Sequence, residues 1–184
     1  MKKAIKYSIL GLAALCTVLL CGGYYMLGYS LKPDDLVSRS RNIAASYDFM
    51  YERYPELHPW VDSLMTAGVL KDFYIENDRG ETLHALYVAA AHPTLKTAVI
   101  VHGYTDNAIR MFHIGYLYNQ SLDYNILLPD LRYTGLTEGD AIQMGWKDRL
   151  DVMQWMNLAQ GLYGDSTQMV VHGISMGAAT TMMV

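Results

Sequence analysis

The stretch that decides the fold is Gln168-Met169-Val170-Val171-His172-Gly173-Ile174-Ser175-Met176-Gly177, where a short apolar run leads into a Gly-x-Ser-x-Gly pattern. The residues that follow, 178–183, are typical of the start of a helix. Between a buried strand and a helix, this pattern predicts a nucleophile elbow, a sharp turn that raises the serine hydroxyl above the edge of a sheet. Gly173 and Gly177 then leave room for the helix to pack against the strand. The alternative is a glycine-rich turn without chemistry.

A second apolar run, Thr97 to Val101, is followed by His102-Gly103-Tyr104-Thr105-Asp106. An uninterrupted apolar run of this length is typical of a buried parallel strand. Attack on an acyl carbonyl requires two backbone N–H donors, one from the residue after the serine and one from the loop after an earlier strand. Met176 and Tyr104 occupy these two positions. His102 and Gly103 then support an oxyanion hole, unless they only turn the chain out of the sheet.

A third apolar run, Tyr124 to Leu128, precedes a loop with an ordered set of polar residues and glycines, namely Asp130, Arg132, Gly135 and Gly139. Together with the two motifs above, this loop resembles the Asp-x-Arg-x-x-Gly-x-Ser-x-Gly pattern of the α/β-hydrolase family, with Thr137 in place of the usual Ser. The resemblance covers roughly residues 70 to 184 and is greatest to bacterial membrane-anchored hydrolases of the serine-aminopeptidase-like or esterase-like branch. It implies that the four loop residues are structural.

The catalytic acid and histidine of this fold follow the serine along the chain. None of residues 176–184 is an acid or a histidine, and all six histidines precede Ser175. We expect each of these histidines to be structural or solvated rather than a general base. The chain is therefore expected to be an N-terminal fragment, truncated after the elbow and inactive alone because the acid and the histidine lie downstream.

The amino-terminal segment predicts a membrane helix. Three lysines, Lys2, Lys3 and Lys6, precede residues 7–31, which carry no charge. A helix of that length spans about 37 Å, enough to cross a hydrocarbon core of about 30 Å. The lysines favour a single-pass signal-anchor with the body outside the cytoplasm, on the periplasmic or cell-surface side. A cleaved signal peptide of a secreted protein and a lipoprotein anchored at Cys21 are the alternatives.

Three segments organise the chain in this interpretation: a transmembrane segment (1–31), a helical connecting region (32–69) and the N-terminal part of an α/β-hydrolase domain (70–184). Within the last, residues 72–76 and 82–88 alternate around a turn and predict an antiparallel hairpin. From residue 97 onward, strands alternate with helices, one of them at 148–161, which predicts a mainly parallel sheet. Ser175 and Tyr104 should then lie at the carboxyl edge of adjacent central strands.

The composition of the chain argues against several classes of function. A net charge of −4 and a pI near 5.8 give no basic stripe for nucleic acid. Both cysteines, Cys16 and Cys21, lie in the apolar segment, so we expect neither a disulfide framework nor a thiolate metal site, and no cofactor. The chain is predicted to cleave an ester, thioester or amide bond through an acyl-enzyme on Ser175, and its substrate is predicted to be a small acyl ester or a peptide. An acyltransferase and a membrane-tethered non-catalytic module remain the alternatives.

Overall fold

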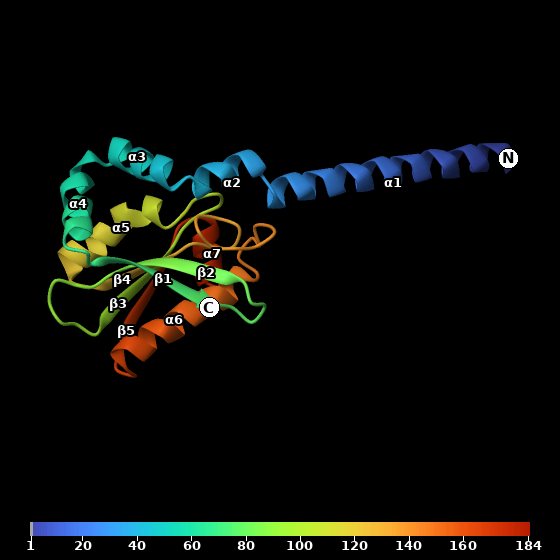
Figure 1. The fold of residues 1–184 in the computed structure, drawn as a ribbon. Coiled ribbons are helices and arrows are strands. Elements are labelled where there is room, and N and C mark those ends of the chain that lie inside the picture. The colour runs from blue at the N-terminus through green and yellow to red at the C-terminus, as the bar shows by residue number, and fades with distance from the viewer. Residues whose placement is uncertain (1) are drawn as a thin grey trace. The chain divides into compact units, whose positions relative to one another are not determined.

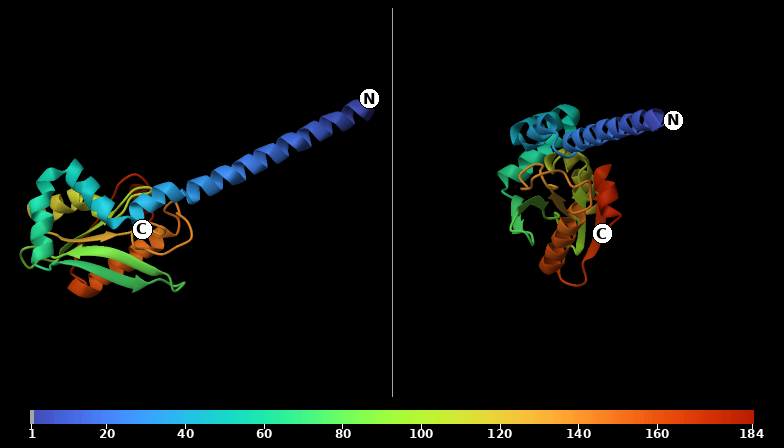
Figure 2. Two further views of the ribbon diagram at one scale, coloured as in Figure 1. Left: turned by 45° about the horizontal axis from the view of Figure 1, so that its top comes forward. Right: turned by 90° about the vertical axis from the view of Figure 1, so that its right-hand side faces the viewer.

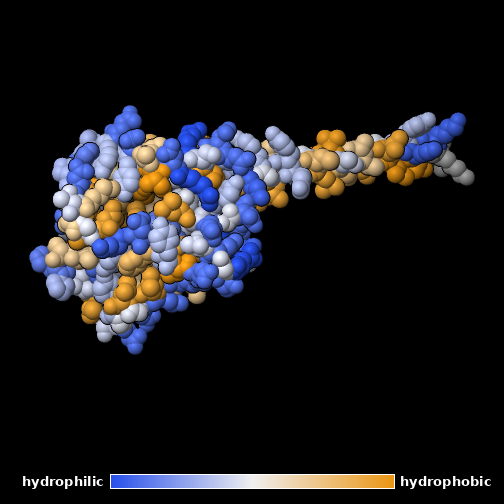
Figure 3. Space-filling model, in the orientation of Figure 1, coloured by the Kyte–Doolittle hydropathy of each residue, from blue (hydrophilic) through white to orange (hydrophobic). Residues whose placement is uncertain are grey.

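The structure, a computed structural model, describes residues 2–184, and the chain divides into two units, residues 1–33 and 34–184. The first unit is a single helix, α1 (Lys2–Leu31), in which no residue from Lys3 onward is buried. Apolar side chains run along this helix (Figure 3). By length and composition α1 could cross a membrane, a test that a signal sequence also passes.

The second unit is built on one sheet of five strands in the order β1-β2-β4-β3-β5. The strands are β1 (Leu70–Glu76), β2 (Thr82–Val88), β3 (Lys96–Val101), β4 (Asn125–Pro129) and β5 (Gln168–Gly173). The predicted hairpin is confirmed, because β1 and β2 pair antiparallel along their whole length. The predicted parallel pairing after residue 97 is also confirmed, because β3 runs parallel to both β4 and β5.

Two features of the sheet differ from the expectation. Strand β2 pairs antiparallel with β4, so the sheet is mixed rather than mainly parallel. Strand β5 neighbours β3 as expected, but among the described strands it lies at one edge of the sheet and not at its centre. A sequence pattern identifies a strand by its apolar run, whereas the order of strands depends on pairings between distant segments.

Helices cover both faces of the sheet (Figure 1). The helices of the second unit are α2 (Asp34–Arg41), α3 (Ile43–Arg53), α4 (His58–Thr66), α5 (Phe112–Tyr116), α6 (Asp148–Tyr163) and α7 (Met176–Thr181), with short turns η1 (Pro55–Leu57), η2 (Ile109–Met111) and η3 (Leu117–Ser121). Helices α3 to α5 pack on one face, and α6 and the start of α7 on the other, an arrangement that Figure 2 shows from two further directions.

The helices at 34–66 belong to the same compact unit as the sheet. Met50 and Val61 are fully buried, and Trp60 packs edge-on against Phe112 of α5. Burial of such side chains stabilises a fold by about 1.5–3 kcal/mol each. These helices are therefore part of the core of the second unit.

Helix boundaries differ slightly from the sequence pattern. Helix α6 continues to Tyr163 and ends where Gly164 adopts a φ of 80°. Helix α7 begins at Met176 and ends at Thr181, although the apolar pattern continues to Val184. The Thr181 hydroxyl and the Met182 backbone N–H both bond to the Ala178 carbonyl, which closes the last turn.

Candidate active site

Ser175 forms the apex of a sharp turn between β5 and α7. Its φ of 55° and ψ of −118° lie in a region that glycine adopts freely and other residues seldom do. Such a backbone conformation costs about 1–3 kcal/mol and persists only where the surrounding structure imposes it. The side chain is exposed to solvent. A strained, exposed serine between a strand and a helix has the geometry of a nucleophile elbow.

The two glycines that flank the serine are required by space. A Cβ at Gly173 would lie 2.3 Å from the Gly177 carbonyl oxygen, and a Cβ at Gly177 would lie 2.3 Å from the Val101 carbonyl oxygen. Both contacts are with backbone, which cannot rotate out of the way as a side chain can. The first glycine therefore allows α7 to fold back on β5, and the second allows α7 to pack against the end of β3.

The loop after β3 approaches the serine closely. A Cβ at Gly103 would lie 3.3 Å from the Ile174 carbonyl oxygen and 3.4 Å from the Cβ of Ser175. Tyr104 and Thr105 follow in a turn closed by a hydrogen bond from the Asp106 N–H to the Gly103 carbonyl (3.3 Å). Met176 is the first residue of α7, where backbone N–H groups have no partner within the helix. The structure thus brings the start of the loop that carries Tyr104 close to the turn from which α7 begins.

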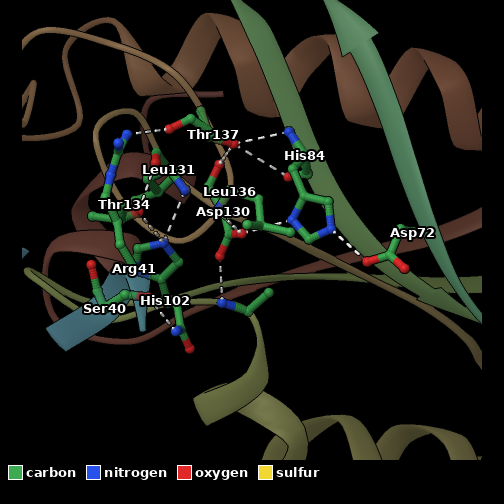
Figure 4. Close-up of polar contacts among 12 residues, drawn as sticks. Ser40, Arg41, Asp72, His84, His102, Asp130, Leu131, Thr134, Leu136 and Thr137 are labelled. Carbon is green, nitrogen blue, oxygen red and sulfur yellow. Dashed lines mark hydrogen bonds and ion pairs between the residues drawn. The ribbon is translucent and has the colours of Figure 1, made fainter. Parts of the chain in front are cut away.

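His102 fastens the loop after β3 to the loop after β4. Its ring is fully buried, and Nδ1 donates to the Gly103 carbonyl at 2.7 Å. Nε2 accepts the Leu131 backbone N–H at 2.9 Å, and the Thr134 hydroxyl lies 3.1 Å from the same nitrogen (Figure 4). Since Nε2 accepts, the neutral ring carries its proton on Nδ1. Both ring nitrogens are committed to these loop contacts.

The Asp130 carboxylate is a buried acceptor for three donors. Oδ1 accepts the Ala108 N–H at 2.7 Å, and Oδ2 accepts the Leu136 N–H at 2.9 Å and contacts Nδ1 of His84 at 2.7 Å (Figure 4). A Cβ at Gly135, whose φ is 51°, would lie 2.1 Å from this carboxylate. Gly135 therefore allows the loop to close over Asp130.

Thr137 performs the hydrogen bonding that a serine could perform at its position. Its hydroxyl accepts the His84 backbone N–H at 2.9 Å and donates to the Asp130 carbonyl at 2.9 Å. A Cβ at Gly139, whose φ is 136°, would lie 3.1 Å from the Tyr133 backbone nitrogen. The hydroxyl and the glycine together keep the end of the loop against β2.

Arg132 is a buried cation with two acidic partners. Its Nε and Nη2 donate to the two oxygens of Asp151 at 2.6 and 2.8 Å, and Nη1 lies 3.0 Å from a Glu81 oxygen. Its backbone N–H approaches Asp148, whose other oxygen accepts the Gly145 N–H at 2.8 Å. Burial raises the pKa of the fully enclosed Asp148 carboxyl, and these backbone donors oppose that rise. Asp130 and Arg132 thus direct their side chains to the protein itself.

His84 is the histidine whose surroundings the sequence did not indicate. It lies on β2 with 2% of its surface exposed, and its Nε2 contacts Asp72 at 2.9 Å while Nδ1 contacts Asp130. Burial by itself lowers the pKa of His84, but the hydrogen bonds and negative charges of Asp130 and Asp72 raise it above the ordinary value of 6.5. The pairing of β1, β2 and the β4 loop is what assembles this group.

No histidine among residues 2–184 makes a hydrogen bond to Ser175. The remaining four bond elsewhere: His58 to Asp62, His92 to Asp123, His113 to the Arg110 carbonyl and His172 to the Tyr118 hydroxyl. In the part of the chain that the structure describes, no cluster of His, Cys, Asp and Glu could hold a metal ion. The elbow and its loop are therefore assembled without a general base from these residues.

Two cavities near the sheet lie away from the elbow. One of about 820 Å³ opens where β3 and β4 begin, at the opposite end of these strands from Ser175, and is lined in part by Tyr87, Asn125 and Tyr163. A small one of about 40 Å³ lies beside His84 and Asp130. Sheets of this type bind ligands at the carboxyl ends of their parallel strands, so the larger cavity lies at the edge of the sheet opposite to the one where a substrate of Ser175 is expected.

Comparisons with known proteins bear on the fold of the second unit. No family model matches the chain. The uncharacterized protein YqkD of Bacillus subtilis is 25% identical over 182 residues, which are 97% of this chain and 55% of that protein. Among solved structures, an esterase of Pyrococcus furiosus, Pf2001, is 26% identical with a TM-score of 0.53, over 60% of this chain and 44% of the esterase.

A second structural neighbour is a putative α/β hydrolase of Agrobacterium tumefaciens, ATU1826, with 23% identity and a TM-score of 0.53 over 61% of this chain and 53% of that one. The chain thus spans about half the length of the proteins it matches. The second unit has an α/β-hydrolase-like fold with a mixed five-stranded sheet, and its structural neighbours support a hydrolase of the α/β type.

Proposed function

We propose that the protein is a serine hydrolase that cleaves an ester, thioester or amide through an acyl-enzyme on Ser175. The observation that carries this proposal is the strained, exposed serine at φ 55°, whose Cβ would lie 3.4 Å from a Cβ at Gly103 in the loop after β3. The Ser175 oxygen attacks the substrate carbonyl, the leaving group departs with a proton, and water then hydrolyses the acyl-enzyme. The substrate class is a small acyl ester or a peptide.

In this mechanism the backbone N–H groups of Tyr104 and Met176 stabilise the oxyanion. Met176 is the residue after the serine, and Tyr104 lies in the loop after β3, which are the two positions from which this class of enzyme takes its donors. One such donor contributes about 10²–10³ in kcat. His102, Gly103, Gly173 and Gly177 support the site by holding its backbone in place.

The general base and the acid that orients it are proposed to come from outside residues 1–184. The support is that all six histidines of this chain lie without a hydrogen bond to Ser175 in the described residues. An activated serine needs a base within about 2.6–3.2 Å. The chain by itself is then inactive, and the longer protein carries the activity.

We also propose that α1 remains attached as a single-pass anchor, with the second unit on the extracytoplasmic side. The support is the unburied apolar surface of α1 and the lysines in its amino-terminal part. Amino-terminal sequencing of the membrane fraction should begin at the start of the chain, and an alkaline phosphatase fused after residue 184 should be active. A soluble product beginning near Lys32 would contradict the anchor.

The experiment that tests the chemistry compares Ser175→Ala with Ser166→Ala in the full-length protein. Ser166 is also exposed and lies in the turn before β5, so it is a matched control. We expect Ser175→Ala alone to abolish turnover of short p-nitrophenyl esters and labelling by a fluorophosphonate. Equal turnover by wild type and Ser175→Ala would contradict the proposal. Absence of labelling in the wild type would favour a tethered module without catalysis, and acyl transfer to an alcohol in preference to water would favour an acyltransferase.

A further inference from the structure

The segment where α2 meets α3, residues 40–46, contacts both the loop after β3, which approaches the elbow, and the loop after β4. The side-chain Nδ2 of Asn107, in the loop after β3, donates to the Ser40 carbonyl and to the Ser46 hydroxyl, both at 2.7 Å. Arg41 of the same segment donates from Nη2 to the Thr137 carbonyl, in the loop after β4, at 2.8 Å. One helical segment early in the chain therefore joins two loops that are distant in sequence.

The side-chain amide of Asn107 is buried, and both its nitrogen and its oxygen form hydrogen bonds. The residue is 1% exposed, and Ser40 and Ser46 are completely buried. While both N–H groups of the amide go to α2 and α3, its Oδ1 accepts the Arg110 backbone N–H at 3.2 Å. A buried polar group whose partner is removed has lost its contact with water without a hydrogen bond in return, so displacement of this amide destabilises the fold.

Ala108, the residue after Asn107, is held by the loop after β4. The Ala108 N–H donates to the Asp130 carboxylate at 2.7 Å, in the group of contacts that Figure 4 shows. The end of the loop after β3 is thus fixed at two successive residues by two different parts of the protein. The beginning of the same loop is fixed by His102.

Between these fixed ends lies the stretch that carries the proposed oxyanion donor. Thr105, next to Tyr104, has a φ of 55°. A non-glycine residue keeps such a conformation only where its surroundings impose it. Asn107 lies two residues after Thr105, and its side chain links this stretch to α2 and α3.

We propose that Asn107 is a positioning residue, whose amide uses α2 and α3 to set the loop that presents the Tyr104 N–H to the oxyanion. The inference rests on the proposed function. It assigns the helices that precede the sheet a part in the reaction, because they determine where one oxyanion donor lies. Misplacement of a catalytic group by about 1 Å can reduce the rate about 10²-fold.

The test compares Asn107→Leu with Asn125→Leu in the full-length protein. Asn125 is a matched control because it is 3% exposed, donates to the Thr94 and Lys96 carbonyls and accepts the Ala90 N–H, at the opposite end of the sheet. Ser46→Ala, which removes one acceptor of the Asn107 amide, serves as a milder variant if Asn107→Leu fails to fold. Three quantities are measured: amide hydrogen exchange at residues 103–106, the separate values of kcat and KM, and inhibition by a phenylboronic acid, whose serine adduct places an anionic oxygen in the oxyanion hole.

For Asn107→Leu we expect faster exchange at residues 103–106, a fall in kcat of about 10² with little change in KM, and a parallel loss of boronate affinity. Ser46→Ala should change the same quantities in the same direction to a smaller extent, and Asn125→Leu should lose stability without these changes. The inference would be overturned if hydrogen exchange at residues 103–106 were unchanged in both Asn107→Leu and Ser46→Ala. It would also be overturned if the kcat and the boronate affinity of Asn107→Leu equalled those of Asn125→Leu. A wild type without turnover contradicts the proposed function instead, and the exchange data then decide whether Asn107 orders the loop.

Discussion

Replacing Gly177 by alanine places one methyl group where the structure has backbone. The added Cβ would lie 2.3 Å from the Val101 carbonyl oxygen and 2.4 Å from the His102 carbonyl oxygen. The first distance is 1.1 Å shorter than the 3.4 Å at which ordinary contact begins. Helix α7 would therefore have to move about 1 Å away from the end of β3, and Ser175 and the Met176 N–H would move with it.

Two effects of different size follow from this displacement. Overpacking of a close contact typically lowers the free energy of unfolding by about 1–3 kcal/mol. A shift of about 1 Å in a reacting group can lower the rate about 10²-fold. We therefore expect Gly177→Ala to fold with reduced stability and to lose most of its activity.

Gly161→Ala is the matched control, because Gly161 lies in the exposed part of α6 with no atom within 4 Å of an added Cβ. Alanine is the better helix former by about 0.5–1 kcal/mol, so this variant should gain stability and keep its activity. Urea unfolding in detergent and the rate of fluorophosphonate labelling of the full-length protein measure the two effects. If Gly177→Ala matched Gly161→Ala in both, the close approach of α7 to β3 would not be what positions the serine.

Four further predictions concern β2, the loop after β4 and the serine itself. The pKa of His84 is raised in the folded protein, so the positive charge of His84 stabilises the fold fully below about pH 6.5, and this stabilisation is lost as the pH rises through the folded pKa. Urea unfolding at a series of pH values should show this fall in stability in the wild type and not in His84→Gln. Thr137→Val should lower the free energy of unfolding by about 1–3 kcal/mol, whereas Thr137→Ser keeps the hydroxyl and should lose less. Arg132→Met should lower it by about 3–5 kcal/mol because Asp151 is left buried and unpaired, and adding Asp151→Leu should recover most of the loss. Ser175→Gly should unfold with a free energy about 1 kcal/mol above that of Ser175→Ala, because glycine adopts φ 55° without strain; equal values in urea unfolding would show that the turn is not strained.

The local features of the sheet could be predicted from the sequence. Each uninterrupted apolar run became a strand within one or two residues of its expected bounds, as Thr97 to Val101 became β3. Strands β3 and β4 are buried as expected, whereas β5, at the edge of the sheet, is only partly buried. The hairpin followed from alternation around a turn, and the elbow followed from glycine spacing. These features depend on neighbours in the sequence, so a local pattern suffices to indicate them.

The rest depends on contacts between distant segments. The antiparallel pairing of β2 with β4 places His84 beside Asp130, 46 residues away, and no local pattern indicates that contact. Asn107 contacts Ser40 across 67 residues. Both contacts occur only once the sheet has formed and the helices have packed on it, which is why the sequence pattern showed His84 as a strand residue and did not indicate Asn107.

The residues of the elbow distinguish a turn that only joins β5 to α7 from a turn that holds a reacting serine. At positions 173 and 177 the chain has glycine, where any side chain would meet backbone at 2.3 Å. At position 175 the backbone conformation favours glycine even more directly, since its φ is 55°, yet the chain has a serine there, at a cost of about 1–3 kcal/mol. A turn that served only to join β5 to α7 would be more stable with glycine at its apex. The exposed hydroxyl is what the strained residue adds, and this favours a reacting serine over a turn retained for its shape.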